Sequence, residues 1–268
     1  MAAAVAWQYP FMAQPLPAGP LVVAHRGASI EAPENTLTAF RLAAEAGADA
    51  VELDVRLTAD GVPVVLHDVD VSSTTDGSGP VHTLTLAEVK RLDAAAGRGP
   101  REEIPTLAEA LSSLTLAVDI EIKNLPGDPD FDSPHEKALV ATVAALEEMR
   151  FPHPVLISSF NWITIERCRE LAPDVATGFL TLAGIEPSAG LDYSAAAGHA
   201  FVLPAVPALV QAGPAFVTEA HQAGIRVGTW TVDDEELIGR LLGWGVDAVA
   251  TNDPRLAVRV RDGASVEE

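Results

Sequence analysis

The chain has 268 residues, 48% of them hydrophobic, and a formal net charge of −21 at pH 7. This length and composition exclude a disordered segment and predict one large α/β domain with a sizeable core. The excess of negative charge argues against a nucleic-acid binder or a protein that docks on anionic membranes, because phosphate groups are held by surplus Lys and Arg.

Residues 1–20 are predicted to form a flexible N-terminal arm, because prolines interrupt them and they lack the basic start and unbroken apolar stretch of a signal peptide. No run elsewhere approaches the roughly 20 apolar residues of a membrane span. We therefore expect a cytoplasmic protein without stable membrane insertion. The single cysteine, Cys168, rules out an intramolecular disulfide and a metal site built from several cysteines.

The first predicted strand, Leu21–Ala24, is a short apolar run that ends in the polar residues His25 and Arg26. This pattern is typical of a buried parallel strand that delivers polar groups at its carboxyl end. A helix is predicted next, with Asn35 as its N-terminal cap and Gly47 closing it. Strand and helix together form one β-α unit.

The segment from Ala50 to Asp68 carries ionisable groups inside strand-like apolar runs. Glu52 and Asp54 are two residues apart, so their side chains point to the same face of a strand. A divalent cation such as calcium or magnesium would relieve the repulsion between the two carboxylates. The alternative is an amphipathic edge strand with a wet acidic face.

The turn at Thr58–Gly61 is too short for a parallel crossover, so Val62–Asp68 is predicted to return as an antiparallel hairpin strand.

Residues 69–105 are rich in Ser, Thr, Gly and Pro and are predicted to form an excursion over the mouth of the fold, with one helix at 86–92. A short helix at 107–114 leads into a predicted strand at Leu116–Lys123. Alternation places three charged residues of this strand on one face: Asp119, Glu121 and Lys123. The opposite face is apolar, as in a barrel strand whose charged face lies near a catalytic mouth.

The remainder of the chain alternates between predicted helices and strands. Helices are predicted at 136–149, 163–171, 216–223 and 234–244. Strands are predicted at 155–160, 176–182, 200–205, 225–232 and 246–251. Without the hairpin strand, eight strands alternate with helices or crossovers, which predicts a single (β/α)₈ TIM-type barrel over residues 21–260, followed by a tail at 261–268. An open doubly wound sheet is the competing architecture, but the first turn lacks its glycine-rich G-x-G-x-x-G pattern.

Polar residues lie at the carboxyl ends of most predicted strands. They are His25, Arg26, Glu52, Asp54, Glu121, Lys123, Ser158, Ser159, Trp230, Thr231 and Asn252, with His67 near the end of the hairpin strand. In a closed barrel the carboxyl ends of the strands converge on one mouth. We therefore expect residues far apart in the sequence to form one site.

An ordered set of motifs runs through most of the chain and resembles the glycerophosphodiester phosphodiesterase family. The motifs are H-R-G, P-E-N-T, E-L-D-V, T-x-D-G, H-D, E-I-K, S-S-F, W-T-V and T-N-D-P, from His25 to Pro254. Each motif alone is common, whereas their ordered set is specific. The resemblance implies a phosphoric diester hydrolase on a (β/α)₈ barrel.

The resemblance also implies a role for each motif residue. The implied metal ligands are Glu52, Asp54 and Glu121, an oxygen-only set that suits Mg²⁺ or Ca²⁺ better than zinc. The implied general acid/base pair is His25 and His67, since imidazole titrates near neutral pH. The implied substrate contacts are Arg26 and Lys123, facing the phosphoryl oxygens, and Trp230, packing on the glycerol carbons. Glu34 would hold the His25 loop in place.

The reaction implied by the resemblance is hydrolysis of a glycerophosphodiester to glycerol 3-phosphate and an alcohol. The glycerol's own hydroxyl attacks phosphorus, and water then opens the resulting cyclic phosphate. Two alternatives stay open: a phosphodiesterase that cleaves lysophospholipids, and a barrel that binds phosphodiesters without turnover. The preferred headgroup, the role of Asp119 and the oligomeric state also stay open.

One position departs from the family pattern. The family usually has an arginine before T-T-x-G, where this chain has Ser73. The metal and acid/base positions are untouched by this change, so it bears on loop anchoring or substrate preference.

Overall fold

Eight parallel strands close into a barrel in the computed structural model, which describes residues 14–263. They are β1 (Leu21–His25), β2 (Ala50–Leu57), β4 (Ala117–Ile122), β5 (Val155–Ser159), β6 (Ala176–Thr181), β7 (Phe201–Pro204), β8 (Arg226–Thr229) and β9 (Ala248–Thr251). β1 pairs with both β2 and β9, which closes the ring. β3 (Pro63–Val65) pairs antiparallel with β2, so the predicted barrel and its returning hairpin strand are both confirmed.

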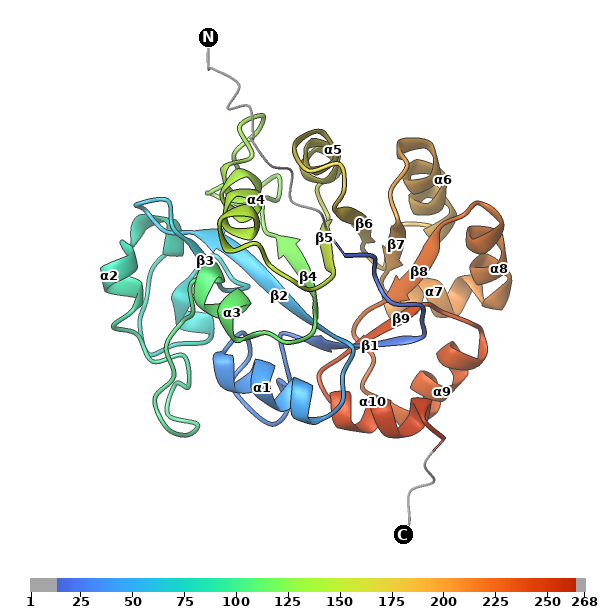
Figure 1. Cartoon of the computed structure of the whole chain (residues 1–268), viewed down its shortest axis with the longest axis horizontal. Helices are drawn as coiled ribbons and strands as arrows, with labels where there is room; N and C mark the ends of the chain where they lie inside the picture. The colour runs from blue at the N-terminus through green and yellow to red at the C-terminus, as the bar shows by residue number, and fades with distance from the viewer. Residues whose placement is uncertain (1–13, 264–268) are drawn as a thin grey trace.

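Helices surround the barrel in Figure 1. They are α1 (Leu37–Glu45), α3 (Leu107–Ser113), α4 (Lys137–Met149), α5 (Trp162–Leu171), α6 (Pro187–Ala197), α7 (Val206–Ala212), α8 (Pro214–Gln222), α9 (Glu235–Gly243) and α10 (Pro254–Arg261). Three of them, α6, α7 and α10, were not predicted. The buried face of α6 includes Gly190 and Ser194, and a Cβ on Gly190 would lie 3.0 Å from Thr181. Close packing through such small residues leaves little apolar periodicity in the sequence.

Both faces of β2 are buried, although one of them is charged. Val51, Leu53 and Val55 are fully buried and belong to the core between strands and helices. Glu52 and Asp54 point the other way, into the barrel, and are buried as well. The edge-strand alternative with a solvated acidic face is therefore wrong.

Thr36, and not Asn35, caps α1. The Thr36 side chain accepts a hydrogen bond from the backbone N–H of Ala39. Asn35 has a φ of +58° and donates its side-chain amide to Asp54 instead. The predicted cap was wrong by one residue because either side chain suits a cap, while only the fold shows that Asn35 has a partner on β2.

The excursion of residues 69–105 has a small core of its own. It contains α2 (Leu86–Val89) and two single 3₁₀ turns, η1 (Val71–Ser73) and η2 (Val81–Thr83). Val71, Val81 and Val89 pack with residues of the hairpin strand. The excursion therefore lies beside β3, as Figure 1 shows for α2.

The described part of the N-terminal arm contacts the barrel. Arg226, the first residue of β8, donates a 2.9 Å hydrogen bond to the carbonyl of Pro17, and Leu16 packs on the apolar cluster inside the barrel. The remainder of the predicted arm, residues 1–13, and most of the predicted tail, residues 264–268, lie outside the described residues. Within residues 14–263, no helix has the length and apolar composition needed to cross a membrane.

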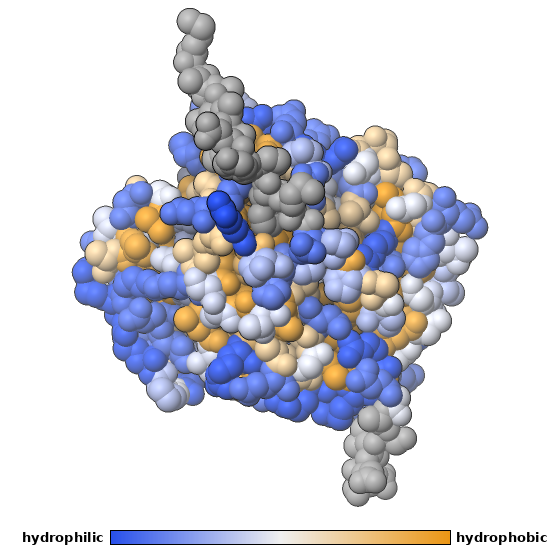
Figure 2. Space-filling view, viewed as in Figure 1, coloured by the Kyte–Doolittle hydropathy of each residue, from blue (hydrophilic) through white to orange (hydrophobic). Residues whose placement is uncertain are grey.

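The molecular surface is largely hydrophilic, as the many charged residues of the chain lead one to expect. Hydrophilic residues cover most of the periphery of the face in Figure 2. This agrees with a chain that carries 38 acidic residues against 17 Lys and Arg.

Candidate active site

The charged residues predicted at the strand ends meet inside one end of the barrel. In the β2–β4 register Asp54 lies opposite Glu121, and Glu52 lies opposite Asp119. Oxygen atoms of Glu52, Asp54 and Glu121 lie within 4.8 Å of one another. The arrangement follows from the parallel pairing, because residues on the inner face of neighbouring strands stand side by side.

These three carboxylates fit a metal ion. Glu52 Oε1 is buried and makes no hydrogen bond to the protein, and Asp54 Oδ1, also buried, has only an ion pair with Lys123. Burial and the neighbouring carboxylates raise the pKa of Glu52 well above its ordinary value, and burial also raises the pKa of Glu121. An all-oxygen donor set of this kind suits a hard divalent cation. Such an ion would offset the repulsion among the three carboxylates and would give the unbonded carboxylate oxygen a partner.

Asp54 is the most firmly held of the three carboxylates. Asn35 donates to its Oδ2 at 2.8 Å, and Arg26 Nε lies 3.2 Å from the same oxygen. Lys123 Nζ lies 3.1 Å from Oδ1. Burial works against ionisation of Asp54, but Lys123 and Arg26 outweigh it and hold the pKa below its ordinary value. Asp54 is therefore ionised, with its direction fixed from several sides.

The two predicted phosphate contacts are both anchored to acidic side chains. Arg26 Nη1 donates to Glu34 at 2.8 Å, as predicted for the His25 loop, and its backbone N–H donates to Glu52 at 2.9 Å. Lys123 is only 5% exposed, and its Nζ donates to Glu121 at 2.5 Å. The two cations thus compensate the carboxylates on β2 and β4.

His25 is positioned by a chain of polar contacts from the end of β9. Its Nδ1 lies 2.8 Å from Asn252 Oδ1. Asn252 is oriented in turn by Asp233, which accepts a 2.7 Å hydrogen bond from its side-chain amide. Since an amide oxygen only accepts, Nδ1 carries the proton, and Nε2 is the nitrogen left for chemistry. Burial, together with Arg26, holds the pKa of His25 below its ordinary value.

His67 is positioned by a carboxylate. Its Nδ1 lies 2.7 Å from Asp68 Oδ1, which again leaves Nε2 for chemistry. Burial lowers the pKa of His67, against the opposing field of Asp54. The pKa of Asp68 lies below its ordinary value because hydrogen bonds from Ser73 and His67 outweigh partial burial. Ser73, where the family usually has arginine, therefore helps to lower the pKa of the residue that orients His67.

The backbone of His67 is held by a buried arginine. Arg56 Nε donates a 2.8 Å hydrogen bond to the His67 carbonyl. The Arg56 guanidinium also forms 3.0 Å ion pairs with Asp128 and Asp130, in the loop after β4. This places the loop after β4 and the end of the hairpin in one rigid arrangement.

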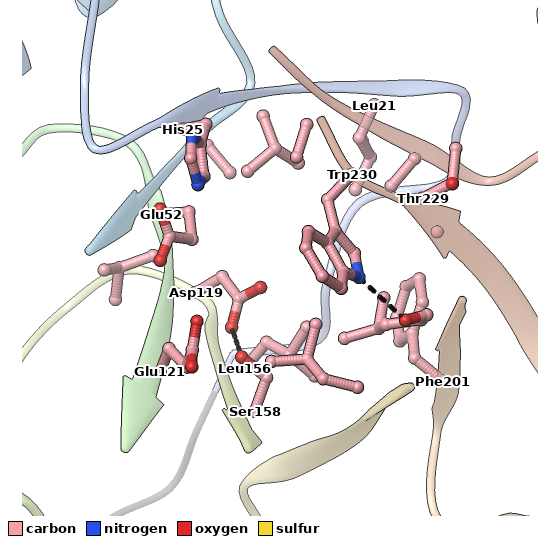
Figure 3. A pocket seen from close by; sticks show the side chains of 18 of the residues that line it. Leu21, His25, Glu52, Asp119, Glu121, Leu156, Ser158, Phe201, Thr229 and Trp230 are labelled. Carbon is pink, nitrogen blue, oxygen red and sulfur yellow. Dashed lines mark hydrogen bonds between the residues drawn. The ribbon is translucent and has the colours of Figure 1, made fainter. Parts of the chain in front are cut away.

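Trp230 faces the charged residues across a cavity of about 60 Å³ that also borders His25, Glu52 and Glu121 (Figure 3). Its indole N–H donates to the carbonyl of Leu203 at 2.9 Å. Phe160 packs edge-on against it, with 5.3 Å between the ring centroids. Trp230, fixed by both contacts, forms an apolar wall across the cavity from Glu52 and Glu121.

Asp119 borders the same cavity. It lies on β4 two residues before Glu121 and on the same face of the strand. Ser158 Oγ donates to Asp119 Oδ1 at 2.7 Å, and Figure 3 shows the carboxylate directed between Glu52 and Trp230. Burial raises the pKa of Asp119 to about 7. Its carboxylate is not part of the group of three that fits a metal.

Seven of the eight residues named from the sequence border the cavity or contact a residue that does. His67 lies within the electrostatic influence of Asp54, Lys123 and Arg26. The supporting contacts were not predicted: Asn35 was placed as a cap, Asn252 was expected at the site without a role of its own, and no role was given to Asp233 or Phe160. Asn252 and Phe160 did carry a signal, because they belong to the T-N-D-P and S-S-F motifs. Asp233 lies outside those motifs.

Comparison with known proteins agrees with this geometry. The family model described as "Glycerophosphoryl diester phosphodiesterase family" matches residues 25–256. A glycerophosphodiester phosphodiesterase of Caldanaerobacter subterraneus subsp. tengcongensis is 38% identical over 252 residues, which cover 91% of this chain and 98% of the relative. One from Bacillus subtilis is 31% identical over 91% of this chain and 87% of its own length.

Solved structures share the fold over nearly the whole chain. A phosphodiesterase of Oleispira antarctica, solved in complex with the product sn-glycerol-3-phosphate, superposes with a TM-score of 0.82 at 33% identity, covering 91% of this chain and 97% of that one. A protein from Silicibacter pomeroyi superposes with a TM-score of 0.81 at 28% identity, covering 94% and 96%. With its ordered motifs, its closed barrel and these relatives, the chain belongs to the glycerophosphoryl diester phosphodiesterase family of hydrolases.

Proposed function

We propose that this enzyme uses a divalent cation, Mg²⁺ or Ca²⁺, to hydrolyse glycerophosphodiesters to glycerol 3-phosphate and an alcohol. The observation that carries the proposal is the group of three carboxylates, two of which, Glu52 and Glu121, border the same cavity as His25 and Trp230. The Oleispira antarctica relative, solved with sn-glycerol-3-phosphate, supports the same product here.

The cation would be held by Glu52, Asp54 and Glu121. When bound, it supplies a Lewis acid that stabilises negative charge on the phosphoryl group and on the attacking oxygen. Asn35 keeps Asp54 turned toward this position by its 2.8 Å hydrogen bond. Arg26 and Lys123, which already neutralise the carboxylates, add positive charge for the phosphoryl oxygens.

The two histidines have different partners, and we assign them different roles. His25 is supported by the neutral amide of Asn252, so it stays neutral and takes the proton from the attacking glycerol hydroxyl. His67 is supported by the Asp68 carboxylate, which stabilises an imidazolium, so it gives its proton to the leaving alcohol. In the second step the roles reverse as water opens the cyclic phosphate.

The apolar wall receives the carbon atoms of the glycerol unit. Trp230 stands across the cavity from Glu52 and Glu121, with Phe160 packed against it. A glycerol between Trp230 and these carboxylates packs its carbons on the indole ring while its hydroxyls face the polar side. Because the reacting groups bind the glycerol and phosphate, the leaving alcohol points outward. Specificity is therefore broad at the leaving group and strict at glycerol.

Release of glycerol 3-phosphate across a panel of headgroups tests this proposal. We expect glycerophosphocholine and glycerophosphoethanolamine to have kcat/KM values within about tenfold of each other, a difference of about 1.4 kcal/mol. Bis(p-nitrophenyl) phosphate, which lacks the neighbouring hydroxyl, should not be cleaved. Comparable turnover of that compound would refute the cyclic intermediate and favour direct attack by water.

A lysophospholipid substrate is the second candidate, and one observation favours it. Exposed apolar side chains lie on loops or helix starts that follow the strands at the mouth: Ile30, Phe131, Trp162, Ile163, Leu182 and Ile185. Leu182 and Trp162 are 59% and 53% exposed, and such residues could border an acyl chain. Turnover of lysophosphatidylcholine exceeding that of glycerophosphocholine would establish this candidate over the first.

A further inference from the structure

The cavity beside the carboxylates has an apolar lining, apart from the groups already assigned to chemistry. Leu156, Leu180, Phe201 and Leu203 are among the apolar side chains that line the wall away from the carboxylates. Thr229 also borders it, but its hydroxyl is engaged with the carbonyl of Pro204 at 2.8 Å. A polar group on such a wall is costly unless it has a partner.

Asp119 and Ser158 are the polar pair on this part of the wall. The Ser158 hydroxyl donates to Asp119 Oδ1 at 2.7 Å, which fixes the carboxylate plane. The carboxylate is directed into the cavity in Figure 3, so its second oxygen faces the space in which a ligand would lie. A carboxyl oxygen that makes no other hydrogen bond accepts one from a hydroxyl donor, so the oxygen that faces the cavity is suited to a hydroxyl of the ligand.

The position of Asp119 relative to the reacting groups identifies that donor. It precedes Glu121 by two residues on the same strand face and lies opposite Glu52. Two residues of a strand span roughly 6.6 Å, so Asp119 lies deeper in the barrel than the layer formed by Asp54 and Glu121. A glycerol whose phosphoryl end and attacking hydroxyl lie at that layer extends its third carbon, and the hydroxyl on it, toward Asp119.

We infer that Asp119, held by Ser158, accepts a hydrogen bond from the terminal hydroxyl of the glycerol unit and selects substrates in which that hydroxyl is free. This inference rests on the proposed glycerophosphodiesterase function. The contact distinguishes glycerol from diols that retain the attacking hydroxyl but lack the terminal one. It also disfavours lysophospholipids acylated at that hydroxyl, since the ester oxygen cannot donate.

The test compares glycerophosphocholine with 2-hydroxypropyl phosphocholine, which keeps the attacking hydroxyl and lacks the terminal one. A hydrogen bond to a charged group is worth about 10- to 100-fold in such a comparison, so the wild-type enzyme should prefer glycerophosphocholine by that factor in kcat/KM. Asp119→Ala should bring the ratio close to one, mainly by loss of activity on glycerophosphocholine. Ser158→Ala, which frees the carboxylate without removing it, should reduce the ratio less.

A binding measurement separates recognition from chemistry and covers the case of a variant with a damaged fold. Calorimetry should show that glycerol 3-phosphate binds the wild-type enzyme about 10- to 100-fold more tightly than 2-hydroxypropyl phosphate, and that the isosteric Asp119→Asn variant narrows this gap. Metal affinity should not change in Asp119→Asn, because Asp119 is not among the three grouped carboxylates.

Four outcomes would overturn the inference. Asp119 does not recognise the terminal hydroxyl if the wild-type enzyme has a kcat/KM ratio near one for the two diesters. The same conclusion follows if this ratio is unchanged in folded Asp119→Ala and Asp119→Asn. A loss of metal affinity in Asp119→Asn would make it a metal ligand instead. If the wild-type enzyme cleaves neither diester, the proposed function fails and takes the inference with it, a result distinct from cleavage of both at equal rates.

Discussion

The two halves of the barrel meet around one cavity but contribute different chemistry. The half from β1 to β4 supplies the histidines, the carboxylates and their cationic partners. The half from β5 to β9 supplies an aromatic and aliphatic wall, with Trp230, Leu180 and Leu203 facing the charges. The first half therefore provides charge and proton transfer, and the second half provides an apolar surface that fits the substrate.

The charged half is stabilised by partners for several of its charges. Asp54 alone contacts Asn35, Arg26 and Lys123, and without such contacts a buried carboxylate would be costly. The wall instead achieves its shape through small residues. A Cβ on Gly228 would lie 2.7 Å from Leu203, so glycine at this position gives Leu203 the room to face the cavity.

The largest effects should follow from changes to proton transfer in the charged half. His25→Ala and His67→Ala should each lower kcat by roughly 10²- to 10⁴-fold, because each removes a group that transfers a proton in the transition state. His221→Ala is the matched control, since His221 pairs with Asp247 next to the start of β9. Equal losses in all three variants, measured by steady-state kinetics, would indicate a general loss of stability.

The next largest effect should come from the residue that orients the metal site. Asn35→Ala should weaken Mg²⁺ or Ca²⁺ binding by about 10- to 100-fold, the usual cost of losing a partner that orients a ligand. Thr36→Ala is the control. It removes the cap of α1 and should cost about 1 kcal/mol of stability while leaving the metal affinity unchanged in calorimetric titration. The reverse pattern would mean that Asn35 acts only on the helix.

The partner of His67 should affect the pH dependence more than the maximal rate. A general acid must be protonated, so activity falls as the pH rises through its pKa. Burial holds the pKa of His67 below its ordinary value, and the 2.7 Å contact with Asp68 offsets part of this lowering. Asp68→Asn weakens the offset and lowers the pKa of His67 further. The alkaline limb of the kcat/KM profile should therefore move to lower pH. A shift of the acid limb alone would assign His67 as the base instead.

Changes to the wall should have the smallest effect. Trp230→Leu removes an aromatic surface that packs on the substrate before and during reaction alike, so KM should rise by roughly 2- to 10-fold with kcat nearly unchanged. A fall in kcat without a change in KM would show that the wall acts on the transition state. It would contradict the assignment of catalysis to the charged half and of substrate binding to the wall.

The charged half could be predicted from the sequence, and the wall could not, for a physical reason. Glu52, Asp54 and Lys123 interrupt apolar strands, so each requires an explanation that a site provides. Leu180 and Leu203 look like ordinary core residues, because the same apolar alternation serves a packed interior and a binding wall. Trp230 was recognised only through its motif.

The supporting contacts were also hidden, because they join distant parts of the chain. Asn252 and His25 are separated by 227 positions, and no local pattern links them. Asn35 looked like a cap because Asn is a good capping residue, while its true partner on β2 is 19 positions away. The helix α6 was missed since its buried face includes glycine and serine. Hydrophobic periodicity and sequence motifs thus predict the helices, the strands and the reacting groups. They do not predict the contacts that orient those groups.

Metal dependence tests the central claim most directly. Release of glycerol 3-phosphate from glycerophosphocholine should be measured on the untreated enzyme, after removal of metal with EDTA, and after addition of Mg²⁺ or Ca²⁺. Because three buried carboxylates lie within 4.8 Å of one another, we predict that chelation abolishes turnover and that one of these ions restores it, with a rise in Tm on binding. Full activity in the chelated, metal-free enzyme would contradict the account.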